Sequence, residues 1–173
     1  MRVLVTGGVR SGKSRHAESL LSGPVTYLAP GPVYDDADWA ARVAAHRARR
    51  PADWATVESH DLVGVLARAD GHVMVDCLGT WLTAVIDESR LWDAPAERAT
   101  RFVAGMAREA ADVLGVRDQG EDTVLVTNEV GWGVIPEHRS GRLFRDLLGT
   151  VNEELASACD EVHLVVAGRV LVL

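Results

Sequence analysis

Short apolar runs alternate along this chain with longer stretches in which alanine, leucine and charged residues are mixed. Several short runs are apolar throughout, as strands buried on both faces of a sheet are. The mixed stretches carry apolar residues at helical spacing. This alternation predicts an α/β fold. The predicted strands cover residues 2–6, 25–29, 72–76, 123–127, 161–166 and 170–173.

The intervening stretches predict helices that cover a largely parallel sheet. They span residues 13–21, 39–50, 61–69, 78–86, 94–114 and 139–158. Pro51 ends the second of them, because proline cannot continue a helix. The polar connector at residues 115–122 is too short to separate domains. We therefore expect a single domain over residues 1–173, with a three-layer fold in which helices flank a central sheet.

The strongest motif follows the first predicted strand. Residues 7–14 match G-x-x-x-x-G-K-[ST], a P-loop, and lie between a predicted strand and a predicted helix, as the motif requires. Consecutive backbone amides would surround phosphate oxygens, Lys13 would neutralise the β- and γ-phosphates, and Arg10 would add positive charge. The expected nucleotide contacts are Gly7, Gly8, Val9, Arg10, Ser11, Gly12, Lys13 and Ser14.

A P-loop enzyme also needs an acidic residue at a strand end to help hold magnesium. The apolar strand at residues 72–76 ends on Asp76. We expect Ser14 and Asp76 to bind Mg²⁺ together with the nucleotide phosphates. The alternative is that Asp76 only caps the following helix.

The helix at residues 39–50 carries a histidine among arginines. Arg42, His46 and Arg49 or Arg50 share one of its faces. Fixed positive charge keeps an imidazole neutral and attracts phosphate, and a neutral histidine can act as a nucleophile. A basic, solvent-facing helix with an incidental histidine explains the same pattern, and spacing alone leaves both interpretations open.

Charge and composition narrow the function classes. A net charge of -7 argues against a broad nucleic-acid surface, which requires clustered positive charge. Cys77 and Cys159 have no metal-ligand spacing, which favours a reducing compartment. Because there is no apolar run of about 18 residues, we expect no membrane span and a cytoplasmic protein.

Several further segments carry a more specific pattern. The P-loop match extends over residues 5–18, His-Arg-Ala-Arg-Arg-Pro covers residues 46–51, and Thr-Asn-Glu-Val-Gly-Trp-Gly covers residues 127–133. Asp76 begins a matching Asp-Cys-Leu, and residues 142–168 continue the match. Together they resemble the bifunctional adenosylcobinamide kinase and adenosylcobinamide-phosphate guanylyltransferase family over nearly the whole chain.

The resemblance implies two reactions. The first phosphorylates adenosylcobinamide with ATP or GTP and Mg²⁺. The second transfers GMP from GTP to adenosylcobinamide phosphate through a guanylyl-histidine, which the resemblance puts at His46. It also implies a homo-oligomer, specifically a trimer.

The resemblance further implies nucleotide contacts outside the P-loop, at Ala29, Pro30, Gly31, Arg47, Ala48, Arg49, Arg50, Glu58 and Asp76. Without it, residues 29–31 are a turn and Glu58 is an exposed acid. Pro30 and Gly31 depart from the hydroxyl residues common in the family. Two alternatives stay open at this point: a single-activity P-loop kinase of a small metabolite, and a GTP-binding regulatory protein.

Overall fold

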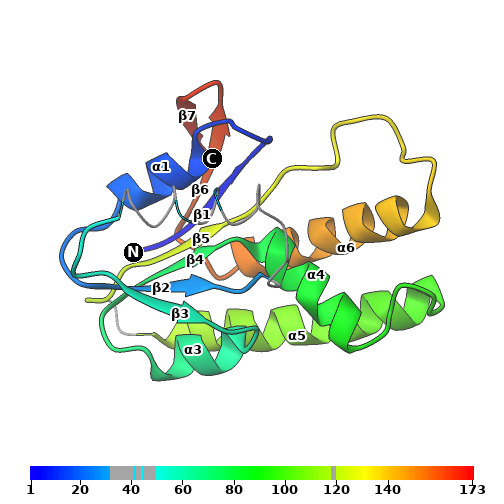
Figure 1. The fold of residues 1–173 in the computed structure, drawn as a ribbon, viewed down its shortest axis with the longest axis horizontal. Coiled ribbons are helices and arrows are strands. Elements are labelled where there is room, and N and C mark those ends of the chain that lie inside the picture. Colours follow the sequence, from blue (N-terminus) through cyan, green and yellow to red (C-terminus); the bar gives the residue numbers. More distant parts are fainter. Residues whose placement is uncertain (32–40, 42–43, 45–49, 118–119) are drawn as a thin grey trace.

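The computed structural model describes residues 1–31, 41, 44, 50–117 and 120–173. A twisted sheet runs through the molecule and helices lie against both of its faces (Figure 1). The strands are β1 (Arg2–Gly7), β2 (Val25–Ala29), β3 (Ala55–Glu58), β4 (His72–Asp76), β5 (Thr123–Val126), β6 (Glu161–Val166) and β7 (Arg169–Val172).

The order of strands across the sheet is β3-β2-β4-β5-β1-β6-β7. Every neighbouring pair is parallel except β6 and β7, which pair antiparallel. The carboxyl ends of β1 to β6 therefore meet along one side of the sheet, which we call the carboxyl edge. Loops at this edge are where parallel α/β sheets bind ligands.

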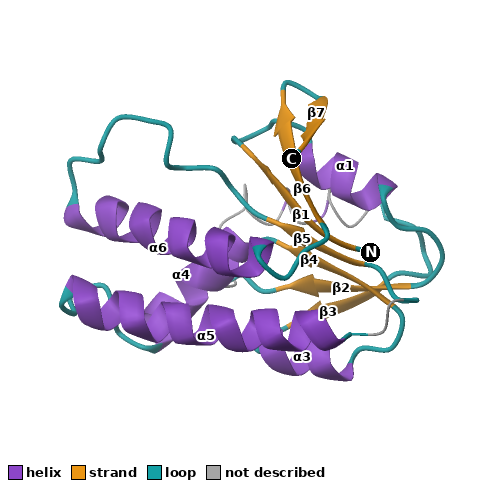
Figure 2. Ribbon diagram, turned by 180° about the vertical axis from the view of Figure 1, so that it is seen from behind, coloured by secondary structure: helices purple, strands orange, loops and turns teal. Residues whose placement is uncertain are grey.

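The helices are α1 (Lys13–Ser19), α3 (Leu62–Arg68), α4 (Leu78–Glu88), α5 (Ala96–Val116) and α6 (Arg139–Ala156). Helix α1 lies on one face, whereas α3, α4, α5 and α6 gather on the other, as the view from behind also shows (Figure 2). No helix in the described ranges is long and apolar enough to cross a membrane.

The central strands contribute side chains to the apolar clusters on both faces of the sheet. Within β1, Val3 and Val5 belong to the apolar cluster that includes Ala17 of α1, while Leu4 belongs to the cluster beneath the other helices. All three are almost fully buried. Successive side chains of a strand point to opposite faces, so a strand covered on both faces is apolar at every position.

The predicted α/β class, the largely parallel sheet and the flanking helices are confirmed. The predicted strands and the described helices agree with the structure to within a few residues. One element was missed: no strand was predicted at residues 55–58, where β3 lies. The helix predicted over residues 39–50 lies outside the described residues except at Ala41, Ala44 and Arg50.

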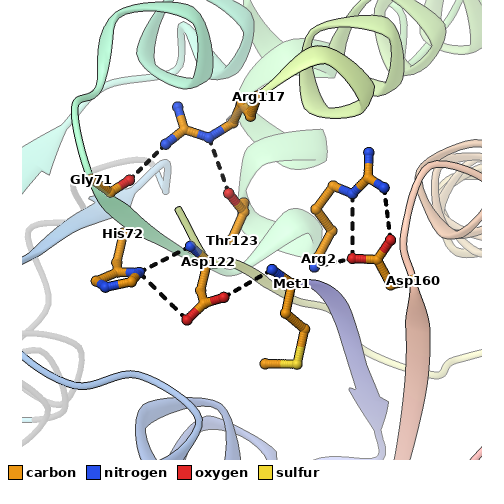
Figure 3. Close-up of polar contacts among 8 residues, drawn as sticks. All are labelled: Met1, Arg2, Gly71, His72, Arg117, Asp122, Thr123 and Asp160. Carbon is orange, nitrogen blue, oxygen red and sulfur yellow. Dashed lines mark hydrogen bonds and ion pairs between the residues drawn. The ribbon is translucent and has the colours of Figure 1, made fainter. Parts of the chain in front are cut away.

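Polar contacts fasten the opposite, amino edge of the sheet (Figure 3). The Met1 amino group forms an ion pair with Asp122 Oδ1 at 2.9 Å, and His72 Nδ1 lies 3.5 Å from Asp122 Oδ2. Beside them the Arg2 guanidinium contacts Asp160 at 2.7 Å. Because these residues begin or precede β1, β4, β5 and β6, the contacts hold the starts of four strands together.

Arg117 lies at the centre of a second set of contacts at this edge. Its guanidinium donates to the backbone oxygens of Leu66, Ala69 and Gly71, and to Thr123 Oγ1 at 3.1 Å. Only 5% of the side chain is exposed. It therefore joins the end of α3 and the start of β5 through hydrogen bonds from a largely buried side chain.

We expect Arg117→Ala to lower the free energy of unfolding by about 3 kcal/mol, because buried carbonyl oxygens would lose their donor. Urea denaturation followed by circular dichroism measures this change. The control is Arg101→Ala, which removes an exposed pair with Glu97 and should change stability by less than about 1 kcal/mol. Equal effects of the two substitutions would contradict the structural role of Arg117.

Candidate nucleotide-binding site

The P-loop connects β1 to α1 at the carboxyl edge. A side chain at Gly7 would lie 2.4 Å from the Val165 carbonyl oxygen, so only glycine fits there. Gly12 caps α1 with a φ of 97°, a left-handed conformation that glycine adopts without strain. The Gly168 amide donates to Ser11 O at 2.8 Å, which attaches the loop to the turn between β6 and β7.

Lys13 begins α1 and points back over the loop. Its ammonium group donates to Gly8 O at 3.2 Å, and the residue is only 9% exposed. Ser14 follows and is half-buried. In the described part of the chain, the buried Ser11 hydroxyl has no hydrogen-bond partner. The loop thus combines an ammonium group, hydroxyls and a helix N-terminus, the groups that bind phosphate oxygens.

The parallel pairing brings several predicted site residues to the carboxyl edge. Ala29 pairs with Glu58, and Leu28 pairs with Val75, next to Asp76. Pro30 and Gly31 continue from β2 at the same edge, where Pro30 is buried. The predicted contacts His46, Arg47, Ala48 and Arg49 lie outside the described residues.

The residues at this edge fit a magnesium ion bound with a nucleotide. Ser14 offers a hydroxyl oxygen and Asp76 a carboxylate, and both residues are half-buried. Mg²⁺ prefers oxygen ligands, and commonly uses one or two protein groups with phosphates and water. Among the described residues, no cluster of three or more histidines, cysteines or acids forms a metal-binding arrangement.

Tyr27 connects Asp76 to Arg50. The tyrosine hydroxyl donates to Asp76 Oδ2 at 3.2 Å, and the Arg50 guanidinium lies 3.7 Å from the centre of the Tyr27 ring. Burial, and then the nearby Asp76 charge, raise the pKa of Tyr27, so it stays protonated. Beside it is a cavity of about 300 Å³, lined by Arg50, Pro51, Ala52, Trp54 and Thr56.

The chain leaving β5 lies beside the P-loop. The Glu129 amide donates to Gly7 O at 3.1 Å, and Thr127 Oγ1 donates to Asn152 Oδ1 of α6 at 2.6 Å. Sequence analysis identified Asn128 and Glu129 as part of a characteristic segment but assigned them no role. Their position in the sequence could have indicated a role in binding, because polar residues directly after a buried strand lie at the ligand-binding edge of the sheet.

A search of protein families adds a decisive observation to this geometry. The model of the family described as cobinamide kinase / cobinamide phosphate guanyltransferase matches residues 3–173. The chain belongs to this family. It is therefore an enzyme of the cobinamide kinase / cobinamide phosphate guanyltransferase kind, as the resemblance implied, and the regulatory-protein alternative is set aside.

Curated relatives agree with the family match. The bifunctional adenosylcobalamin biosynthesis proteins CobU of Salmonella typhimurium and of Escherichia coli are each 41% identical to the chain, covering 97% of it and 97% of their own lengths. The bifunctional adenosylcobalamin biosynthesis protein CobP of Pseudomonas aeruginosa is 35% identical, covering 97% of the chain and 94% of its own length.

A solved structure supports the fold alone. It comes from work described as structural and biochemical analysis of a prototypical ATPase from the type III secretion system of pathogenic bacteria. The TM-score is 0.59 at 12% identity, and the match covers 94% of this chain but 50% of the ATPase chain. Such a likeness confirms a P-loop ATPase-like architecture for this cobinamide kinase / cobinamide phosphate guanyltransferase family member.

A histidine pair lies beneath the phosphate loop of this family member. His16 Nε2 of α1 lies 2.8 Å from His163 Nδ1 of β6, and His163 Nε2 lies 2.8 Å from Glu161 Oε2. Burial, and then the proximity of His163, lower the pKa of His16 from 6.5. The pair connects the P-loop helix to the sheet.

We expect the His16 pair to make stability depend on pH. In the unfolded chain His16 takes a proton near its ordinary pKa, whereas in the folded chain it does so only at lower pH. Between the two values the unfolded state binds more protons, so stability falls as the pH falls through this window. Urea midpoints at about pH 5.5 and 7.5 should differ less for His16→Gln than for the wild type. The exposed His138→Gln control should behave as wild type.

Proposed function

We propose that the chain phosphorylates the aminopropanol hydroxyl of adenosylcobinamide and then attaches GMP to the new phosphate, forming adenosylcobinamide-GDP. ATP or GTP supplies the first phosphoryl group, and GTP supplies the guanylyl group. The phosphate cradle between β1 and α1 carries this proposal, because its backbone conformation and buried lysine match what a triphosphate requires. Family membership supports the choice of acceptor.

In the kinase step, the P-loop would hold the triphosphate. Backbone amides of residues 7–14 would surround the phosphate oxygens, and Lys13 would stabilise the negative charge that develops during transfer. Arg10 has a φ of 56°, so its amide belongs to the tightly turned part of the loop. Lys13 and the loop together would hold the γ-phosphorus ready for attack.

Ser14 and Asp76 would hold a magnesium ion on the nucleotide. When bound, this ion would neutralise charge on the β- and γ-phosphates. The Tyr27 hydroxyl donates to Asp76 Oδ2, which orients the carboxylate. Tyr27 would therefore hold the Asp76 carboxylate in position for the magnesium ion.

In the guanylyl step, His46 would act as the nucleophile. Its ring nitrogen would bond to the α-phosphorus of GTP while the bond to the bridging oxygen breaks and pyrophosphate leaves. A phosphate oxygen of adenosylcobinamide phosphate would then attack the same phosphorus and release the histidine. Residues 29–31, 47–50 and Glu58 would bind the nucleotide, with Arg50 held against Tyr27 beside the cavity.

We also propose that residues 1–173 form one domain and that the protein assembles as a homo-oligomer, a trimer by the family resemblance. The support for assembly is β7, the last strand of the sheet. Leu171, Val172 and Leu173 are each more than half exposed, and an edge strand with apolar side chains favours contact with another chain. Light scattering coupled to size exclusion measures the assembly, and a mass of one subunit would contradict it.

A time course tests the pair of reactions. The purified protein is incubated with adenosylcobinamide, Mg²⁺, ATP and GTP. The corrinoid products are then separated, and their masses are measured by mass spectrometry. We expect adenosylcobinamide phosphate to appear first and to be converted to the GDP derivative. Accumulation of the phosphate without further conversion would support a single-activity kinase instead, and no corrinoid product at all would refute both.

A further inference from the structure

The chain that leaves β5 occupies the position between the phosphate cradle and Asp76. Strand β5 is the neighbour of β1 on one side and of β4 on the other. With strands about 4.8 Å apart, β5 lies about 5 Å from the P-loop strand, β4 about 10 Å and β3 about 19 Å. Glu129 follows β5, the strand next to β1, whereas Asp76 ends a strand two positions from β1 and Glu58 ends a strand four positions from it.

Two hydrogen bonds hold Glu129 in place. Its amide donates to Gly7 O at 3.1 Å, which ties it to the first residue of the P-loop, and the Gly131 amide donates to its Oε1 at 3.0 Å. The residue is half-buried. Within the described residues, Oε2 of the same carboxylate accepts no hydrogen bond. One oxygen is therefore oriented by the backbone while the other is open.

Helix α6 supports the peptide that precedes Glu129. Thr127 is fully buried and its hydroxyl donates to Asn152 Oδ1 at 2.6 Å. The Asn152 amide group donates to Asn128 O at 3.3 Å. A functional group whose backbone is held on both sides by fixed elements is pre-organised for chemistry. The peptide between Asn128 and Glu129 is therefore fixed by β1 and α6, while the Gly131 amide orients the carboxylate.

The loop after Glu129 leaves the carboxyl edge and runs out toward the start of α6 (Figure 1). It carries the exposed apolar side chains Val130, Trp132, Val134 and Ile135. An acceptor molecule with apolar surface can approach the cradle along this loop and meet Glu129 at its base. Asp76 is less suited to receive the acceptor hydroxyl, because its carboxylate is the one we assign to the magnesium ion of the nucleotide.

We propose that Glu129 is the general base of the kinase step. This inference rests on the kinase activity proposed above. Glu129 Oε2 takes the proton from the acceptor hydroxyl while the hydroxyl oxygen bonds to the γ-phosphorus. The bond from that phosphorus to the β,γ-bridging oxygen breaks, and the electron pair leaves with the nucleoside diphosphate.

The test compares Glu129→Gln and Glu129→Asp with wild type in two separate assays. One follows phosphorylation of adenosylcobinamide by ATP, and the other follows guanylyl transfer from GTP to added adenosylcobinamide phosphate. The matched control is Glu137→Gln, because Glu137 is an exposed acid at the far end of the same loop. Thermal melting and the KM for ATP report on folding and nucleotide binding.

We expect Glu129→Gln to lower kcat of the kinase step by about 100-fold or more, with little change in KM for ATP, in melting temperature or in guanylyl transfer. Glu129→Asp should retain more of the rate, since it keeps a carboxylate. A kinase rate equal to that of Glu137→Gln overturns the proposal, as do equal rates for the two Glu129 variants. Loss of both activities or of ATP binding overturns it too, because the role is then structural. If the wild type forms no phosphate product, the proposed function itself fails.

Discussion

Replacement of His46 by alanine is expected to abolish the covalent GMP adduct and to lower guanylyl transfer by at least about 1,000-fold. Alanine has no ring nitrogen to bond with the α-phosphorus, so no intermediate can form. The measurement is intact-mass analysis after incubation with Mg²⁺ and GTP, in which wild type should gain the mass of one GMP. Phosphorylation of adenosylcobinamide should continue in the variant, since the P-loop is unchanged.

His138→Ala is the matched control, because His138 is an exposed histidine at the start of α6. It should form the adduct as wild type does, and added adenosylcobinamide phosphate should discharge that adduct. An adduct that persists on His46→Ala would assign the nucleophile to another residue. GTP binding without any adduct on the wild type would contradict a guanylyl-histidine mechanism altogether.

Lys13→Ala is expected to slow the kinase step by about 100- to 1,000-fold, the usual cost of removing one positioned donor from a developing negative charge. Lys13 is largely buried and its ammonium group donates to Gly8 O, so its charge is held over the loop. Steady-state rates with ATP and adenosylcobinamide measure the effect. The affinity for ATP should fall as well, because the ammonium group contacts the phosphates before and during transfer.

The control for Lys13 is Arg15→Ala, which removes an exposed positive charge from the same helix. It should leave the kinase rate within about threefold of wild type, because exposed charges interact weakly across water. Lys13 is also the only lysine in the chain, so amine acylation reports on this position and on the amino terminus alone. ATP with Mg²⁺ should protect Lys13 from acylation, and labelling that ATP does not slow would contradict its place at the phosphates.

Most elements of the fold were predictable because their signals are local. The central strands β1, β4 and β5 are buried on both faces, and each carries three consecutive apolar residues, at positions 3–5, 73–75 and 124–126. The long helices α5 and α6 show apolar residues at helical spacing. Six of the seven strands were found in this way.

Strand β3 was missed because its signal is not local. It has four residues, Ala55 to Glu58, none of them fully buried, and it pairs only with β2 at the edge of the sheet. A short strand without a buried face has a sequence like that of a turn. What makes it a strand is the row of unpaired backbone groups that β2 presents to it.

The candidate site also has one part that the sequence predicts and another that depends on the tertiary structure. A phosphate cradle is made by consecutive backbone amides, so eight contiguous residues were enough to predict it. The contacts of Asp76 with Tyr27, of Arg50 with the same ring, and of Glu129 with Gly7 join residues distant in the chain. Their distances depend on which strands become neighbours, and no single segment contains that information.

The sequence by itself determined the α/β class, the phosphate loop and the family, because each depends on residue types at fixed spacing along the chain. The tertiary structure decided that β5 lies between β1 and β4, and hence that Glu129 is beside the phosphate loop. It also decided that the Arg117 side chain is buried and that His16 is half-buried against the buried His163. The physical reason is that strand order follows from packing both apolar faces of the whole sheet at once, a property of the assembled layers and not of any one segment.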